Sequence, residues 1–144
     1  MLSVVLVAAS LTAQDCGNFR SGEWSDDPGN WSRAFRSTKP DDVVVLHSYY
    51  WRSPHWTFEF RYFFEIEKNA SLRQQLFAKN NLQRLEGEDA ARAKNDSGEG
   101  GPSWFAPGTG DNYEIWVYKD EPRGHFVVLV DKASGAMFLT EYQL

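Results

Sequence analysis

A period-two alternation of large apolar side chains constrains the fold of this chain more than any other feature. The alternation runs along the even positions Trp56, Phe58, Phe60, Tyr62, Phe64 and Ile66. The odd positions between them are polar except for Phe63. Such a pattern is typical of a strand with one buried face. A helix would scatter Phe58, Tyr62 and Ile66 around its surface. The sequence therefore predicts a long strand over 56–66 whose aromatic face forms the core.

Four further strands are predicted from β-branched and aromatic segments. A strand over 43–51 leads through a short polar connection into the aromatic strand, so the two form an antiparallel hairpin. The last third of the chain reads as a three-stranded meander, because its turns have hairpin length and end in glycine. Its candidate strands are 113–119, 125–131 and 136–142.

Helices are predicted in two places. Asp27 and Pro28 provide a helix start, and Trp31 and Phe35 then lie on one face of a short helix. Residues 71–92 have the spacing of one amphipathic helix or of a broken pair. We therefore expect an α+β domain. Its antiparallel sheet would combine an N-terminal β-hairpin with a C-terminal three-stranded meander, with one or two helices packed on one face.

The first thirteen residues differ from the rest of the chain. Residues 1–13 are uncharged, mostly apolar and end on small side chains, as in a secretory signal peptide. No Lys or Arg precedes the apolar run, since Arg20 is the first positive charge, and a buried N-terminal strand or helix is the alternative. The run is shorter than the ~20 residues that span a bilayer. We expect export to the periplasm or the extracellular space, no stable membrane insertion of the mature chain, and a single domain over 14–144.

Charge and cysteine content exclude several classes of function. The net charge is −5, and the fifteen Lys and Arg residues are spread singly, so no basic stripe is available for nucleic acid. Cys16 is the single cysteine and has no Cys/His cluster around it for zinc. The acidic Asp15 before it argues against a lipoprotein. The sequence thus predicts no metal and no cofactor, and it predicts no oligomeric state.

No catalytic residue is predicted. His47, His55 and His125 are isolated, although His47 and His55 could approach each other across the first hairpin. The stretch 97–101 is rich in glycine but has no Gly-Lys-Ser/Thr, so it reads as a flexible linker.

The strand carboxylates offer a second possible chemistry. Glu59 and Glu65 could act as a glycosidase pair if the fold held them at a suitable separation. Arg61 lies between them, which is more typical of charge pairing on a solvated strand face.

The candidate binding residues are aromatic. A loop over 94–110, rich in glycine and proline, carries Trp104 and Phe105. Such a loop must either fold back on the core or present the two rings. We expect both rings to be partly exposed and to anchor a partner, with Trp51 and Trp116 as further candidates.

From these features we expect a small exported, non-enzymatic binding or inhibitor-type domain that acts through a protein–protein surface. The alternative is a secreted carbohydrate-binding or glycoside-active protein that uses exposed aromatic side chains and strand carboxylates.

Export makes a direct prediction about the N-terminus of the mature protein. Protein recovered from expressing cells should begin near Leu11 or Gln14, because a signal peptidase cleaves after small residues such as those that end the apolar run. Intact-mass analysis of the purified protein measures this. Recovery of a chain that retains Met1 from the cytoplasm would contradict the prediction.

Overall fold

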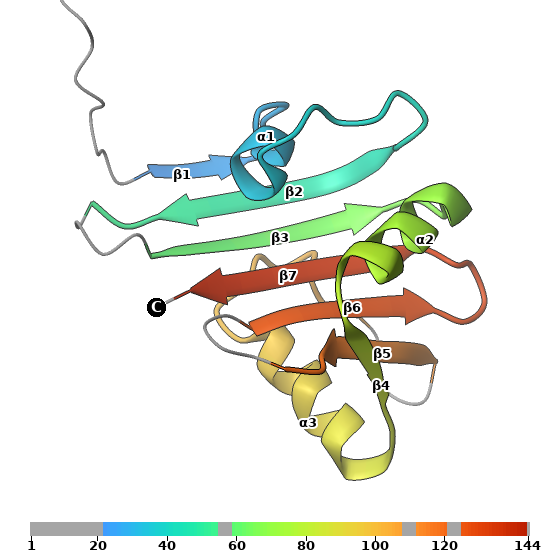
Figure 1. The fold of residues 1–144 in the computed structure, drawn as a ribbon. Coiled ribbons are helices and arrows are strands. Elements are labelled where there is room, and N and C mark those ends of the chain that lie inside the picture. Colours follow the sequence, from blue (N-terminus) through green and yellow to red (C-terminus); the bar gives the residue numbers. More distant parts are fainter. Residues whose placement is uncertain (1–21, 55–58, 108–111, 121–124, 144) are drawn as a thin grey trace, which may run out of the picture.

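The described residues form one antiparallel sheet flanked by three helices. The computed structural model describes residues 22–54, 59–107, 112–120 and 125–143. The elements are β1 (Gly22–Ser25), α1 (Asn30–Phe35), β2 (Val45–Arg52), β3 (Phe60–Ile66), α2 (Ala70–Lys79), β4 (Leu82–Leu85), α3 (Gly87–Gly98), β5 (Tyr113–Tyr118), β6 (His125–Asp131) and β7 (Met137–Gln143). The strand order is β1-β2-β3-β7-β6-β5-β4 (Figure 1). None of the described helices is both long and apolar enough to cross a membrane.

The predicted α+β class is confirmed, and the predicted hairpin and meander are joined in one sheet. β3 pairs with β7 from Phe60 opposite Gln143 to Ile66 opposite Met137. Two further strands, β1 and β4, extend the sheet at its edges. β4 lies inside the segment predicted as helical, which divides into α2, β4 and α3. The division occurs because Asn80 leaves the helix with extended dihedral angles while its amide side chain donates to the Leu76 carbonyl.

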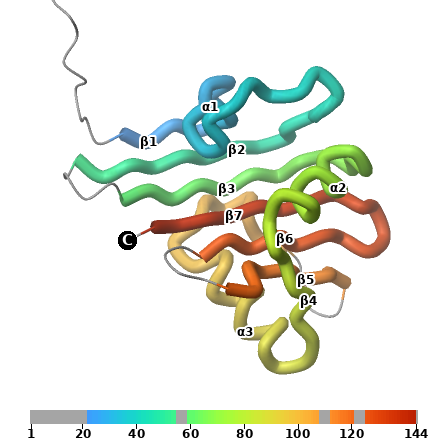
Figure 2. The backbone as a smooth tube through the Cα atoms, viewed as in Figure 1, coloured from blue at the N-terminus to red at the C-terminus, as the bar shows by residue number. Residues whose placement is uncertain are grey.

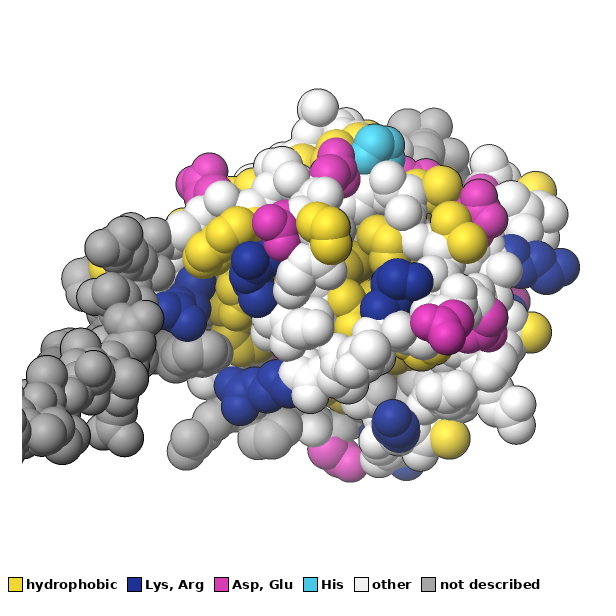
Figure 3. Space-filling model, turned by 90° about the horizontal axis from the view of Figure 1, so that it is seen from above, with side chains coloured by type: hydrophobic (Ala, Val, Ile, Leu, Met, Phe, Trp, Pro, Cys, Tyr) yellow, Lys and Arg dark blue, Asp and Glu magenta, His cyan; other side chains and the backbone are white. Residues whose placement is uncertain are grey.

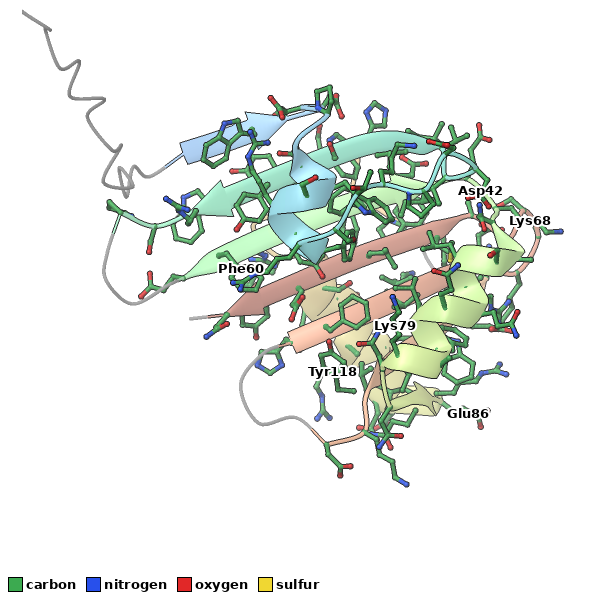
Figure 4. All side chains as sticks on the ribbon, turned by 45° about the horizontal axis from the view of Figure 1, so that its top comes forward. Asp42, Phe60, Lys68, Lys79, Glu86 and Tyr118 are labelled. Atoms are coloured by element: carbon green, nitrogen blue, oxygen red, sulfur yellow. The ribbon has the colours of Figure 1, made fainter. Side chains whose placement is uncertain are left out.

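One face of the sheet packs against α1 and α2 (Figures 1 and 2). Tyr62, Phe64 and Ile66 are fully buried there, as the alternation predicts. Trp56 and Phe58 lie outside the described residues. Phe60 starts the strand at the margin of this core and is only half-buried (Figure 4).

The opposite face is covered as well, by α3 and the segment that follows it. Phe63, at an odd position of β3, is fully buried in this second core. β6 is apolar at every position from Phe126 to Val130, so both of its faces need cover. The helices therefore lie on both faces of the sheet and not on one face as predicted.

The glycine-rich stretch 97–101 ends α3 at Gly98 and continues into a tight turn against the sheet, where the sequence predicted a flexible linker. Gly100 has a φ of +65°, which favours glycine. A Cβ on Gly101 would come within 2.9 Å of the Phe63 ring. The turn can therefore approach the sheet closely, and it directs the following residues onto the second core.

A partly buried hydrogen bond joins β3 and β7 on the α1 and α2 face. The Tyr62 hydroxyl donates to Glu141 Oε2 at 2.6 Å. Burial raises the pKa of Glu141, although the hydrogen bond from Tyr62 partly opposes this. Burial, together with the nearby Glu141 charge, also raises the pKa of Tyr62.

This pair makes a testable prediction about pH and stability. Because the pKa of Glu141 is raised in the folded state, the folded state holds this proton more tightly, and the free energy of unfolding falls as pH rises from the unfolded pKa through the folded one. Glu141→Gln keeps an acceptor for Tyr62 and should remove this fall. Urea denaturation at pH 4 and pH 7 measures it, with exposed Glu67→Gln as control. Equal pH dependence in wild type and Glu141→Gln would contradict the assignment.

Candidate functional site

Strand pairing aligns a row of polar and aromatic side chains on the α3 face, near one end of the sheet. Trp51 in β2 lies opposite Arg61 in β3, and Arg61 lies opposite Tyr142 in β7. His125 in β6 continues the row beyond Tyr142, and Glu23 in β1 extends it beyond Trp51. We call these five residues the aromatic–arginine row. Trp51, Arg61 and Tyr142 are half-buried, and the two end residues are exposed.

Arg61 at the centre of the row stacks on aromatic rings. Its Cζ atom lies 4.8 Å from the centroid of the Phe63 ring and 5.4 Å from that of Tyr142. Its Nε atom is buried without a hydrogen-bond partner, and no ion pair joins Arg61 to a residue in the described ranges. Burial lowers the pKa of Arg61, while Tyr142 and Glu99 act in the opposite direction. A guanidinium stays charged in proteins, so Arg61 is a fixed cation with unused donors.

Two neighbouring cavities open beside the row. The outer cavity, of about 390 Å³, is lined by Arg61, Asp96, Glu99 and Tyr142. The inner cavity, of about 320 Å³, lies between α3 and strands β5, β6 and β7. The two cavities share Asp96 and Tyr142, so together they form a continuous hollow along α3.

Three of the four predicted aromatic residues, Trp51, Trp104 and Phe105, lie on this face. Trp51 belongs to the row. Trp104 is half-buried and stacks on His47, with ring centroids 5.3 Å apart. His47 lies four residues before Trp51 along β2, which corresponds to about 13 Å at the rise of a strand. The Trp104 stack is therefore a separate feature at the other end of β2.

The expectation that Phe105 is exposed is wrong. Its side chain is 3% exposed and packs edge-to-face on Phe63 and Phe138, with centroid distances of 4.8 and 5.7 Å. The reason is that the second sheet face needs an apolar cover, and Phe105 supplies it. Trp116 lies on the opposite face, where its ring packs against the Phe77 ring with centroids 4.7 Å apart.

The two described histidines, His47 and His125, belong to no metal-binding group within the described residues. His55 lies outside the described residues. His47 approaches Asp26 at 3.4 Å, whereas His125 contacts Tyr142 at a centroid distance of 4.4 Å. Across the described segments, no group of three His, Cys, Asp or Glu side chains is placed to hold a metal ion.

The strand carboxylates are not placed as a glycosidase pair. Glu59 and Glu65 are six residues apart, about 20 Å along an extended chain, whereas such pairs need ~5–10 Å. The predicted charge pairing of Arg61 with these glutamates is also absent within the described part of the chain. Arg61 instead stacks on Phe63 and Tyr142.

Another hollow lies near α1, on the side of the molecule seen from above in Figure 3. Three of its four charged side chains already have partners within the chain. Asp26 accepts the Ser48 N–H at 2.9 Å, and Asp27 pairs with Arg33 at 2.7 Å. Lys39 donates to the Val43 carbonyl at 2.6 Å. These bonds fix the local chain, and the hollow offers few free polar groups to a ligand.

Sequence reasoning missed Arg61, Tyr142 and His125 as site residues. They come from three strands whose order in the sheet differs from their order in the chain. No local signal singled out Arg61, because it occupies one of the polar odd positions of the alternation. Comparisons with known proteins give no further guide, because no family model, curated protein or solved structure matches the chain significantly.

The burial of Phe105 predicts a structural role for this side chain. Phe105→Ala should lower the free energy of unfolding by about 3–5 kcal/mol, because it removes a ring from a closed core. Trp104→Ala should cost less, since that ring is half-exposed. Urea denaturation of both variants measures the difference. An unchanged unfolding midpoint for Phe105→Ala would contradict the packing described here.

Proposed function

We propose that the protein is an exported, non-enzymatic binding domain that acts through a protein–protein surface centred on the aromatic–arginine row. The observation that carries the proposal is the environment of Arg61. This side chain lies between Trp51 and Tyr142 on the sheet, and it makes no hydrogen bond or ion pair with any described residue.

The composition of the row matches that of binding hot spots. Trp, Tyr and Arg are the residue types most enriched among the side chains that dominate interface energies. Here all three occur side by side on adjacent strands, at a spacing of about 4.8 Å per strand. Rings on sheet strands are held by their neighbours, so little side-chain entropy is lost when a partner binds.

The charges around Arg61 indicate what a partner would offer. Glu99 and Asp96 line the same cavity as the guanidinium, so the local field is not purely positive. Backbone carbonyls and neutral amides of a partner can accept from Arg61 without repulsion from these carboxylates. The row is therefore suited to an uncharged polar segment flanked by apolar side chains.

Carbohydrate recognition is the second candidate function, and one observation favours it. The outer cavity places the Arg61 donors and the Asp96 and Glu99 acceptors beside the Tyr142 ring. Sugar hydroxyls both donate and accept, and sugar rings stack on aromatic faces. This candidate uses the row without the strand carboxylates Glu59 and Glu65.

Affinity measurements on row variants test the proposed function. A partner captured from the native compartment is identified, purified and titrated against each variant. Arg61→Ala and Trp51→Ala should each weaken binding by about 30-fold or more, since hot-spot truncations cost about 2 kcal/mol or more. Arg84→Ala, on β4 and exposed, is the matched control and should bind as wild type.

Two outcomes would contradict this assignment. Unchanged affinity of Arg61→Ala and Trp51→Ala, at wild-type melting temperature, would exclude the row as the interface. The carbohydrate candidate would be favoured if enzymatic deglycosylation of the partner abolished binding and the protein still bound the released glycan.

A further inference from the structure

We infer that the inner cavity is a binding site for a small, uncharged, mainly apolar molecule that carries one hydroxyl or carbonyl group. This site goes beyond the proposed protein-binding row, because it lies between α3 and the sheet, although His125 and Tyr142 of the row also belong to its lining. The inference rests on the cavity lining, on one buried hydroxyl without a partner, and on the position of the charges.

The walls of the inner cavity are mainly apolar. Their aliphatic part is formed by one residue each of β4, α3, β5 and β6, namely Leu85, Ala93, Val117 and Val127, and polar, aromatic and charged side chains complete the lining. The volume of about 320 Å³ is at the lower end of the range of small-molecule sites. An apolar body of one ring with a short substituent fits walls of this kind.

Thr140 supplies the polar contact of the site. Its side chain is 2% exposed, lines the cavity, and its hydroxyl oxygen has no hydrogen-bond partner. Its cross-strand neighbours, Phe63 and Val127, have apolar side chains. Ser97 also lines the cavity, but its hydroxyl donates to the Lys94 carbonyl at 2.7 Å. The Thr140 hydroxyl oxygen has almost no accessible surface, so a ligand hydroxyl or carbonyl would reach it after a small side-chain shift. The ligand would then satisfy a polar group that is costly to leave unpaired.

The charges near the cavity favour a neutral ligand. Asp89, Arg92 and Asp96 belong to its lining, are exposed and carry charges of both signs. The buried part of the lining holds no charged group. A charged ligand that entered would lose its hydration without a buried counter-charge, which is strongly unfavourable.

NMR titration with two probes tests this site. 4-Ethylphenol and ethylbenzene differ only by a hydroxyl, and both are added to the ¹⁵N-labelled protein. Amide shifts should change at Ala93, Val127 and Thr140, with tighter binding of the phenol. Thr140→Val keeps the side-chain shape and should weaken the binding of 4-ethylphenol by about three- to tenfold. Ethylbenzene affinity should stay within about twofold of wild type, since this probe makes no hydrogen bond.

A cavity-filling variant keeps the test decisive if Thr140→Val fails to fold. Ala93 lines the cavity from α3, so the larger side chain of Ala93→Leu should fill part of the cavity and abolish binding of both probes. Ala91→Leu is the matched control on the same helix, because Ala91 is exposed and does not line the inner cavity. It should bind both probes as wild type.

Three results would overturn the inference. The first is the absence of shifts at these amides with millimolar probe. The second is unchanged binding in Ala93→Leu. The third is tighter binding of 4-ethylbenzoate or 4-ethylbenzylamine than of 4-ethylphenol, which would show that charge and not the Thr140 hydroxyl selects the ligand. None of these results bears on the partner affinities of Arg61→Ala and Trp51→Ala, so the two proposals fail independently.

Discussion

The pairing of β3 with β7 is the interaction on which both cores of this protein depend. It joins the N-terminal hairpin to the C-terminal meander, and it places Phe64 beside Leu139 on one face and Phe63 beside Thr140 on the other. Phe64 and Leu139 belong to the core under α1 and α2, whereas Phe63 belongs to the core under α3. If β3 slipped by one residue, each aromatic side chain would move to the wrong face, so the alternation of β3 fixes this register strongly.

The same pairing explains which parts of the structure could be predicted from the sequence. The alternation in β3 is local, so the strand and its buried face were predictable, as were the three strands of the meander. The row was not, because it requires knowing that Arg61 lies opposite Tyr142, and such long-range register is not encoded in any local pattern. β4 was missed for a different reason, since its four residues fall between two helices and have no clear alternation.

The second core shows that the sheet is covered on both faces, whereas the alternation predicted one solvent-exposed face. A single aromatic residue at an odd position, Phe63, looked like an exception to the alternation. It is instead the centre of a second apolar layer, and Phe105 packs on it from a loop that passes over the sheet. The glycines at 100 and 101 allow this approach, because a side chain at either position would meet Arg61 or Phe63. A loop rich in glycine and tipped with aromatic rings thus forms part of the core, and its composition alone could not distinguish the two roles.

Phe63 also connects this core to the candidate site. One side of its environment is the closed packing with Phe105, and its ring also lies under the Arg61 guanidinium. The ring supports a cation whose Nε atom has no partner, and Thr140, its neighbour on β7, holds a second unpaired polar atom. Unpaired buried polar atoms lower stability, and natural proteins tolerate them mainly where function requires them. These two atoms lie on adjacent strands of the α3 face, one beside the outer cavity and one at the inner cavity, whereas Trp31 Nε1 is a buried unpaired atom in the core under α1 and α2. The two atoms on the α3 face are the ones that the proposed binding would satisfy.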